Sequence, residues 1–250
     1  MRIILSPAKK MRLDLDCPAA RSTPVFLSRT TEIMRWLQGL SYSEAKKLWA
    51  CNDKIAEENY SRLQEMDLQD AAHLTPAILS YDGIAFQYMA PAVFEEGYFD
   101  YVQEHLRILS GFYGVLKPMD GVTPYRLEMQ AKTEVAGKKN LYDYWGDALY
   151  REARDDSGLI INLASREYSC CIEKYLQPED RYITCIFGEA EGGRIVQKGV
   201  YAKMARGDMV RFMAENQVEE PEQLKNYNRM HYRFSEEQSS DTEYVFIREV

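Results

Sequence analysis

Short apolar runs separated by helical patterns limit what this 250-residue chain can fold into. An apolar run of about four to eight residues, bounded by turn-forming residues, is typical of a buried strand. The runs that we predict as strands cover residues 2–5, 77–81, 106–110, 158–163, 182–187, 194–197 and 244–247. The helical patterns cover residues 31–39, 41–49, 53–63 and 202–215. Strands alternate with helices early and pair locally late, which predicts an α/β (α+β) fold with a mixed β-sheet flanked by helices.

The helical segment after residue 40 has a clear start signal and is followed by a short turn. Ser41 and Glu44 match a capping box, in which each side chain hydrogen-bonds the backbone N–H of the other residue. Cys51 and Asn52 then break the helical pattern before it resumes at Asp53, so we predict an αα-hairpin. No linker or internal repeat interrupts the sequence, and residues 1–250 are expected to form a single domain.

The acidic balance of the chain constrains its partners. The sequence has 31 Lys and Arg against 39 Asp and Glu, for a formal net charge of −8. A protein of this sign is repelled by nucleic acid at long range, so any phosphate binding must come from a local basic patch. Residues 1–13 carry four bases and no acid, and residues 194–211 carry five bases against one acid. The chain therefore contains two basic segments although its net charge is negative.

Cysteine, histidine and motif patterns argue against several classes of protein. The five cysteines include no CxxC pair and follow no signal-peptide pattern, so we predict reduced thiols and a cytoplasmic protein. No run approaches the roughly 20 apolar residues that cross a bilayer, and no membrane partner is expected. The three histidines are far apart in the sequence, which argues against a metal site built on them. Common nucleotide-binding, hydrolase and zinc-binding motifs are absent from the sequence, and we predict no cofactor.

Serines at the ends of predicted strands are the first candidate site residues. They are Ser6, Ser80, Ser110 and Ser165. In open α/β sheets, ligands bind beyond the carboxyl ends of the strands, where a serine hydroxyl and the free N–H groups of a following helix can hold an anion. Ser110 and Ser165 are both expected to precede a helix. Serine is also a common helix N-cap, and the sequence leaves the two interpretations open.

Basic residues stand next to two of these serines. Lys9 and Lys10 follow Ser6, and Arg166 follows Ser165 directly. A cation beside a serine hydroxyl strengthens the case for an anion site, because ionised donors make the stronger hydrogen bonds to phosphate or carboxylate.

Two further pairs of charged residues are candidates. Arg126 and Glu128 lie two apart and share a face if the segment is extended, where an arginine fork can bind an anion bidentately. Lys203 and Arg206 lie three apart and share a helix face. The alternatives are a surface ion pair and a solvated helix face. If these residues form one site, a single concave pocket should be lined by Ser6, Lys9, Ser110, Arg126, Ser165, Lys203 and Arg206.

Several segments together resemble one known family. They cover residues 4–9, 107–118, 124–129, 141–147, 162–168 and 201–207. In this order, and over nearly the whole chain, they are similar to the YaaA peroxide-stress family. The resemblance implies a cytosolic bacterial protein that limits free iron and oxidative damage under peroxide stress. It also implies a mixed α/β fold peculiar to the family, with a helix-hairpin-helix element and a positively charged cleft that binds duplex or branched DNA.

The resemblance also suggests where these functions would lie. The helix-hairpin-helix element would fall on residues 41–63, with Lys46, Lys47, Asn52 and Lys54 as its candidate DNA contacts. The candidate anion- or DNA-binding residues are Ser6, Lys9, Lys10, Ser110, Arg126, Ser165, Arg166, Lys203 and Arg206. No catalytic residue is assigned, and the sequence carries no signal for an oligomeric state.

Three hypotheses follow from the sequence. The first is a stress protein that binds DNA through a positively charged cleft. The second is an enzyme or small-anion-binding protein that uses a Ser/Lys/Arg pocket at the strand ends. The third treats the same residues as helix caps, core and solvated surface.

Overall fold

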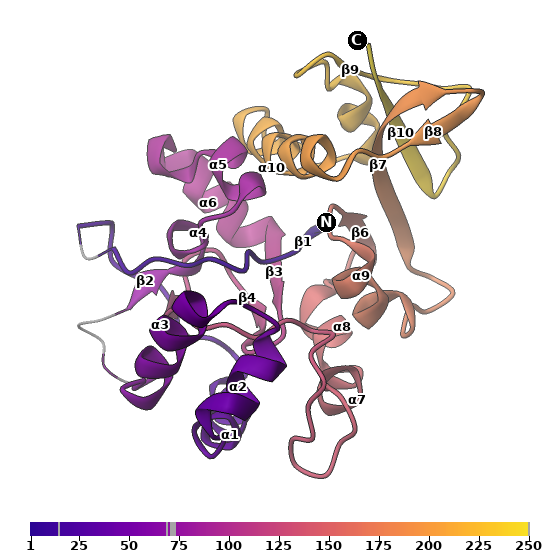
Figure 1. Ribbon diagram of the computed structural model, residues 1–250. Helices are drawn as coiled ribbons and strands as arrows, with labels where there is room; N and C mark the ends of the chain where they lie inside the picture. Colours follow the sequence, from indigo (N-terminus) through magenta and orange to yellow (C-terminus); the bar gives the residue numbers. More distant parts are fainter. Residues whose placement is uncertain (15, 69, 71–73, 250) are drawn as a thin grey trace.

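A mixed β-sheet runs through the centre of the protein (Figure 1). The computed structural model describes residues 1–14, 16–68, 70 and 74–249. Within these residues the main sheet has eight strands in the order β4-β3-β1-β6-β7-β10-β9, with β8 paired to β7. The strands are β1 (Arg2–Leu5), β3 (Leu106–Ser110), β4 (Gly114–Leu116), β6 (Leu159–Asn162), β7 (Arg181–Glu191), β8 (Arg194–Val196), β9 (Tyr232–Phe234) and β10 (Glu243–Arg248). A separate pair is formed by β2 (Thr75–Pro76) and β5 (Gly121–Val122).

The middle of the sheet is parallel and its margins are antiparallel. Strand β1 pairs in parallel with β3 and β6, and β7 pairs in parallel with β6 and β10. Strands β4, β8 and β9 each join in antiparallel. The central strands are apolar and buried, as expected for a sheet covered on both faces. Because β1, β3 and β6 run in the same direction, their carboxyl ends meet at one edge.

Helices cover both faces of this sheet, which confirms the predicted α/β class. Figure 1 shows α5, α6 and α10 together in the upper part of the view and α7, α8 and α9 in the lower part. Helix α6 packs on β1 and β3, and α8 packs on β1 and β4. The helices are α1 (Leu27–Gln38), α2 (Tyr42–Trp49), α3 (Asp53–Gln64), α4 (Ala77–Ser80), α5 (Ile84–Met89), α6 (Glu96–His105), α7 (Leu141–Trp145), α8 (Ala148–Ala153), α9 (Arg166–Glu173) and α10 (Gly199–Glu215), with 3-10 turns at Pro91–Val93 and Pro221–Asn226.

The predicted αα-hairpin is formed by α2 and α3. The capping box is present, because the Ser41 side chain accepts from the Glu44 N–H and the Ser41 N–H donates to the Glu44 carboxylate at 2.8 Å. Ala50 takes a left-handed conformation (φ 46°) that ends α2, and the Asn52 side chain then accepts from the Ile55 N–H at 3.0 Å. The antiparallel helix pair follows from these local signals. Its resemblance to a DNA-binding helix-hairpin-helix stays a prediction.

One predicted strand is wrong. Residues 77–80 form the short helix α4 after β2, and Tyr81 follows it in an extended conformation. All residues of α4 are buried, and a short, fully buried run carries no periodicity that distinguishes a helix from a strand. Ser80 therefore does not end a strand. Its hydroxyl donates to the Arg12 carbonyl at 2.8 Å and has a structural role.

The predicted helix after Ser110 is also wrong. The chain turns sharply at residues 111–113 and returns antiparallel to β3 as β4. The Ser110 hydroxyl closes the turn by accepting from the N–H groups of Phe112 and Tyr113, at 3.1 and 2.9 Å. Gly114 has φ +79°, a left-handed conformation that side chains disfavour.

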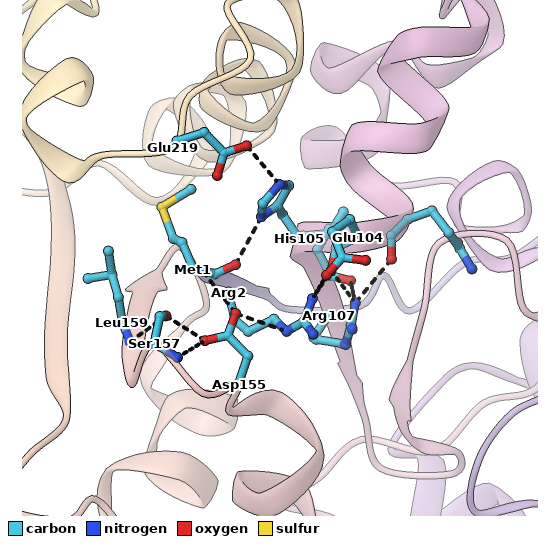
Figure 2. Close-up of polar contacts among 11 residues, drawn as sticks. Met1, Arg2, Glu104, His105, Arg107, Asp155, Ser157, Leu159 and Glu219 are labelled. Atoms are coloured by element: carbon cyan, nitrogen blue, oxygen red, sulfur yellow. Dashed lines mark hydrogen bonds and ion pairs between the residues drawn. The ribbon is translucent and has the colours of Figure 1, made fainter.

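A polar cluster fixes the amino ends of the central strands (Figure 2). Arg2 pairs with Glu104 at 2.9 Å and with Asp155 at 3.5 Å. Arg107 is buried and donates to backbone carbonyls at the end of α6, and burial together with the charge of Arg2 lowers its pKa to about 10. His105 bonds the Met1 carbonyl at 3.0 Å. These charged groups lie at the opposite edge of the sheet from the strand-end serines. Among the described residues, no helix has the length and apolar composition to cross a membrane.

Candidate functional site

A cavity of about 250 Å³ opens at the carboxyl ends of β1 and β6. Its walls come from the chain after β1, the start of α5, the loop at residues 125–128, the chain after β6 with the start of α9, and one face of α10. This is the edge where parallel α/β sheets place their ligands. We call this space the basic cavity, for the charged residues described below.

Most of the residues expected to share a pocket do so. The basic cavity is lined by Ser6, Lys9, Arg126, Ser165, Lys203 and Arg206. They come from segments that are far apart in the sequence, and the parallel strand ends and α10 bring them together. Their role in binding stays a prediction.

The two serines in the cavity bond each other rather than capping α9 in the usual way. Ser6 Oγ accepts from the Ser165 N–H at 2.8 Å and lies 3.1 Å from Ser165 Oγ. Ser165 occupies the N-cap position of α9, yet its side chain makes no capping hydrogen bond. The pair therefore joins the end of β1 to the start of α9.

The charged lining of the cavity is positive although the chain is negative. Four cations, Lys9, Arg126, Lys203 and Arg206, stand against the carboxylates of Glu128 and Glu167. Lys9 and Glu128 form an ion pair at 2.6 Å. Three cations thus face the cavity with one remaining carboxylate, in a chain whose formal charge is −8.

Two arginines of the cavity have no partners of their own among the described residues. Arg126 and Arg206 are half-buried, and the Nε atom of each is buried without a hydrogen-bond partner in that part of the chain. In the described part of the chain, neither forms an ion pair. Burial lowers the pKa of Arg206. A buried donor without an acceptor is unfavourable, so an anion that enters the cavity would supply what both guanidinium groups lack.

Glu167 is a cavity residue that the sequence does not single out. Burial raises its pKa, and the neighbouring charge of Glu128 adds to that effect. Its neighbour Arg166, a candidate from the sequence, is exposed and does not line the cavity. Successive helix residues are rotated by about 100°, which turns the Arg166 side chain away from the face of α9 that carries Glu167 and Tyr168. A carboxyl group with a raised pKa can hold or release a proton near a bound ligand.

Buried hydroxyl groups support one wall of the cavity. Tyr125 lines the cavity, and its hydroxyl lies 2.6 Å from Ser110 Oγ and 2.8 Å from the Tyr81 hydroxyl. Because Ser110 Oγ accepts two backbone N–H groups, its own proton is directed to Tyr125. Burial raises the pKa of Tyr125 to about 12. Ser110 therefore lies behind the wall and does not line the cavity, contrary to expectation.

A second hollow adjoins the cavity on the side of the αα-hairpin. It has a volume of about 650 Å³, and we call it the α2 hollow. Arg126 and Glu128 line both spaces and form the ridge between them. The other walls come from the end of α1, from α2 and from residues 130–132.

Comparison with known proteins gives the family. A family model described as peroxide stress protein YaaA matches residues 1–238. The chain belongs to this family. The resemblance found in the sequence is thereby confirmed, and the family's name supports a role in peroxide stress.

Curated relatives agree over almost the whole length of the chain. A UPF0246 protein of Agathobacter rectalis is 60% identical over 250 residues, which is all of both chains. One from Desulfitobacterium hafniense is 54% identical over 248 residues, covering 99% of this chain and 98% of its own. Another from Limosilactobacillus reuteri is 51% identical over 247 residues, covering 98% of each chain.

The remaining candidate residues of this family member lie outside the basic cavity. Lys10 is exposed and ion-paired with Asp82. In the hairpin, Lys46 is ion-paired with Asp53, Asn52 caps α3 and Lys54 is exposed. Lys47 differs from these because it lines the α2 hollow.

None of the five cysteines of this family member lines the basic cavity. All five cysteines are free thiols. Burial raises the pKa of Cys185 to about 12, and burial also raises the pKa of Cys171, which holds both as unreactive thiols. Over the described ranges, no group of three or more His, Cys, Asp or Glu side chains gathers to hold a metal ion.

Proposed function

We propose that this member of the YaaA family serves in peroxide stress by binding DNA, whose phosphates contact the basic cavity and the ridge beside it. The observation that carries the proposal is the convergence of Lys9, Arg126, Lys203 and Arg206 on one cavity of an otherwise acidic chain. Local positive charge is what phosphate binding requires when the net charge opposes it.

The unpaired state of the arginines supports this proposal. A guanidinium binds phosphate bidentately, and a phosphodiester would meet the buried Nε donors of Arg126 and Arg206, which have no acceptor among the described residues. Basic residues also continue beyond the cavity, because Lys47 and Lys132 line the α2 hollow on the far side of Arg126. A row of cations that extends past the cavity suits a chain of phosphates better than one small anion.

In this proposal, bound DNA in the cytoplasm is shielded from oxidative damage, and free iron is limited as the family resemblance implies. Cells that lack the protein are then expected to hold more free iron and more DNA lesions after peroxide exposure. A gene encoding Arg126→Ala/Arg206→Ala should fail to correct either defect, whereas the wild-type gene should correct both.

The direct test measures the binding of labelled duplex and four-way-junction DNA by fluorescence anisotropy over a series of salt concentrations. Each phosphate that the protein neutralises adds about 0.9 to the slope of log K against log salt. The Arg126→Ala/Arg206→Ala variant should therefore bind more weakly, with a slope that is smaller by about two. The matched control is Lys138→Ala/Lys139→Ala, which removes the same charge from exposed residues outside both hollows. Equal binding by the two variants, or no binding by the wild type at low salt, would rule out the proposal.

A small anionic ligand is the second candidate, and the enclosure of the cavity favours it. A volume of about 250 Å³ suits a small molecule, and Glu167 offers a group able to exchange a proton. Thermal unfolding with phosphate, pyrophosphate or nucleotides tests this alternative. A saturable rise in Tm that is absent in Arg126→Ala/Arg206→Ala, together with no binding to DNA, would favour it over the first proposal.

A further inference from the structure

Two of the three tryptophans in this chain line the α2 hollow. Trp36 is half-buried at the end of α1, and Trp49 is buried at the end of α2, with a relative exposure of 4%. Leu40 and Leu48 extend the same wall. The hollow therefore presents an aromatic and aliphatic surface directly beside the arginine ridge.

The two buried tryptophans of the chain differ in hydrogen bonding. Trp145 is part of the core, and its indole N–H donates to the Gly111 carbonyl at 3.0 Å. The indole N–H of Trp49 is buried and has no partner within the described residues. A buried indole usually has an acceptor, so the wall of the α2 hollow has an unmet donor beside its apolar surface.

The lysines around the hollow have no ion pair in the described structure, whereas both of its carboxylates already have hydrogen-bond or ion-pair partners. Lys47 and Lys132 are exposed, and neither forms an ion pair among the residues that the structure describes. The Glu44 carboxylate accepts from the N–H and the hydroxyl of Ser41, at 2.8 and 2.6 Å. Glu128 is paired with Lys9. The hollow thus offers free cations next to tryptophan side chains.

Tryptophan surfaces combined with lysine and arginine are what proteins use to hold unpaired nucleotides, since bases stack on the rings and phosphates meet the cations. A base inside a duplex is stacked and paired, and cannot reach such a wall. Resting on the proposed DNA binding, we propose that the α2 hollow receives the base of an unpaired nucleotide, while its phosphates lie on Arg126 and the flanking lysines. The preferred ligand is then single-stranded DNA, or the unpaired stretch of a branched one.

The experiment compares three 12-nucleotide DNA ligands: oligothymidine, an abasic strand with the same phosphates, and a duplex. Affinity is measured by anisotropy, and base contact by intrinsic tryptophan fluorescence, to which the hollow contributes two of three tryptophans. Oligothymidine should bind roughly fivefold or more tighter than the abasic strand and should change the fluorescence. The duplex should bind more weakly than oligothymidine and leave the fluorescence unchanged.

A pair of variants localises the effect. Trp36→Leu should lose the preference for oligothymidine over the abasic strand, and its affinity for the abasic strand should stay unchanged. Tyr88→Leu is the matched control, because Tyr88 is an exposed aromatic residue outside both hollows. Equal affinity for all three ligands with unchanged fluorescence would overturn this inference while the DNA-binding proposal stands. Absence of binding to every ligand would overturn both. The comparison of ligands needs no variant, so poor folding of Trp36→Leu would not obscure the answer.

Discussion

Replacing Arg206 by methionine tests whether the cavity holds cations that lack partners. The Arg206 guanidinium is partly buried, its Nε has no hydrogen-bond partner among the residues that the structure describes, and burial lowers the pKa of the group. An unsatisfied buried donor costs about 1–3 kcal/mol. Methionine keeps an unbranched stem that adapts to irregular space, and it carries no charge. We therefore expect Arg206→Met to raise the free energy of unfolding by about 1–3 kcal/mol, even though it removes a binding residue.

The assay is thermal unfolding with and without a single-stranded DNA ligand. For a chain of this size, 1 kcal/mol corresponds to a change in Tm of about 2–4 °C. Lys203→Met is the control for stability, because Lys203 is exposed on the same helix and should leave Tm almost unchanged. Added DNA at 100 times Kd should raise the free energy of unfolding of the wild type by about 2.7 kcal/mol, and therefore its Tm, and should raise the Tm of Arg206→Met less. A clear fall in Tm for Arg206→Met without ligand would refute the reasoning, since the guanidinium would then have stabilising contacts within the protein.

Further predictions concern a titrating group, a close contact and a supporting hydroxyl. Because the folded pKa of Glu167 is raised by burial, the native state binds its proton more tightly, and stability falls as pH rises from about 4.3, the usual glutamate pKa. Glu167→Gln should therefore be more stable than the wild type at pH 7.5 in urea unfolding, and the difference should shrink toward pH 4.5. A methyl group at Gly207 would lie 1.8 Å from the Ala85 carbonyl oxygen, so Gly207→Ala should lower stability by about 1–3 kcal/mol. Gly199→Ala in the same helix has open space around it and should not lower stability, because alanine has the higher helix propensity. Ser110→Ala leaves two buried N–H groups without an acceptor and should also cost about 1–3 kcal/mol, yet leave the salt dependence of DNA binding unchanged.

The sequence predicts the strand-end part of the site well, because a simple geometric rule governs it. Strands β1 and β6 are apolar runs that the sequence alone predicts as strands, and parallel pairing places their carboxyl ends side by side. Ser6 and Ser165 are therefore brought together, as expected. The capping box of Ser41 and Glu44 is predicted equally well, since it depends only on residues three apart.

The errors arise where local sequence does not decide between two structures. The run at residues 77–81 is fully buried, so its apolar residues show neither helical nor strand periodicity. At Ser110 the sequence is compatible with a helix start or a hairpin turn, and the pairing of β4 with β3 decides between them. Glu167 escapes prediction because the side of α9 that faces the cavity is set by tertiary packing, which the order of residues does not reveal.

The charge of the two basic segments shows why composition alone could not locate the site. In residues 194–211, Lys198 and Arg211 are ion-paired with glutamates, whereas Lys203 and Arg206 form no ion pair in the described structure and face the cavity. In residues 1–13, Arg2 is paired with acids at the opposite edge of the sheet. Because nearby acids neutralise most bases of these two segments, the positive potential that a phosphate meets beside them is set by the cations that have no ion pair in the described structure. A protein with a formal charge of −8 can then attract an anion at one place, provided that its acids lie beside the other bases.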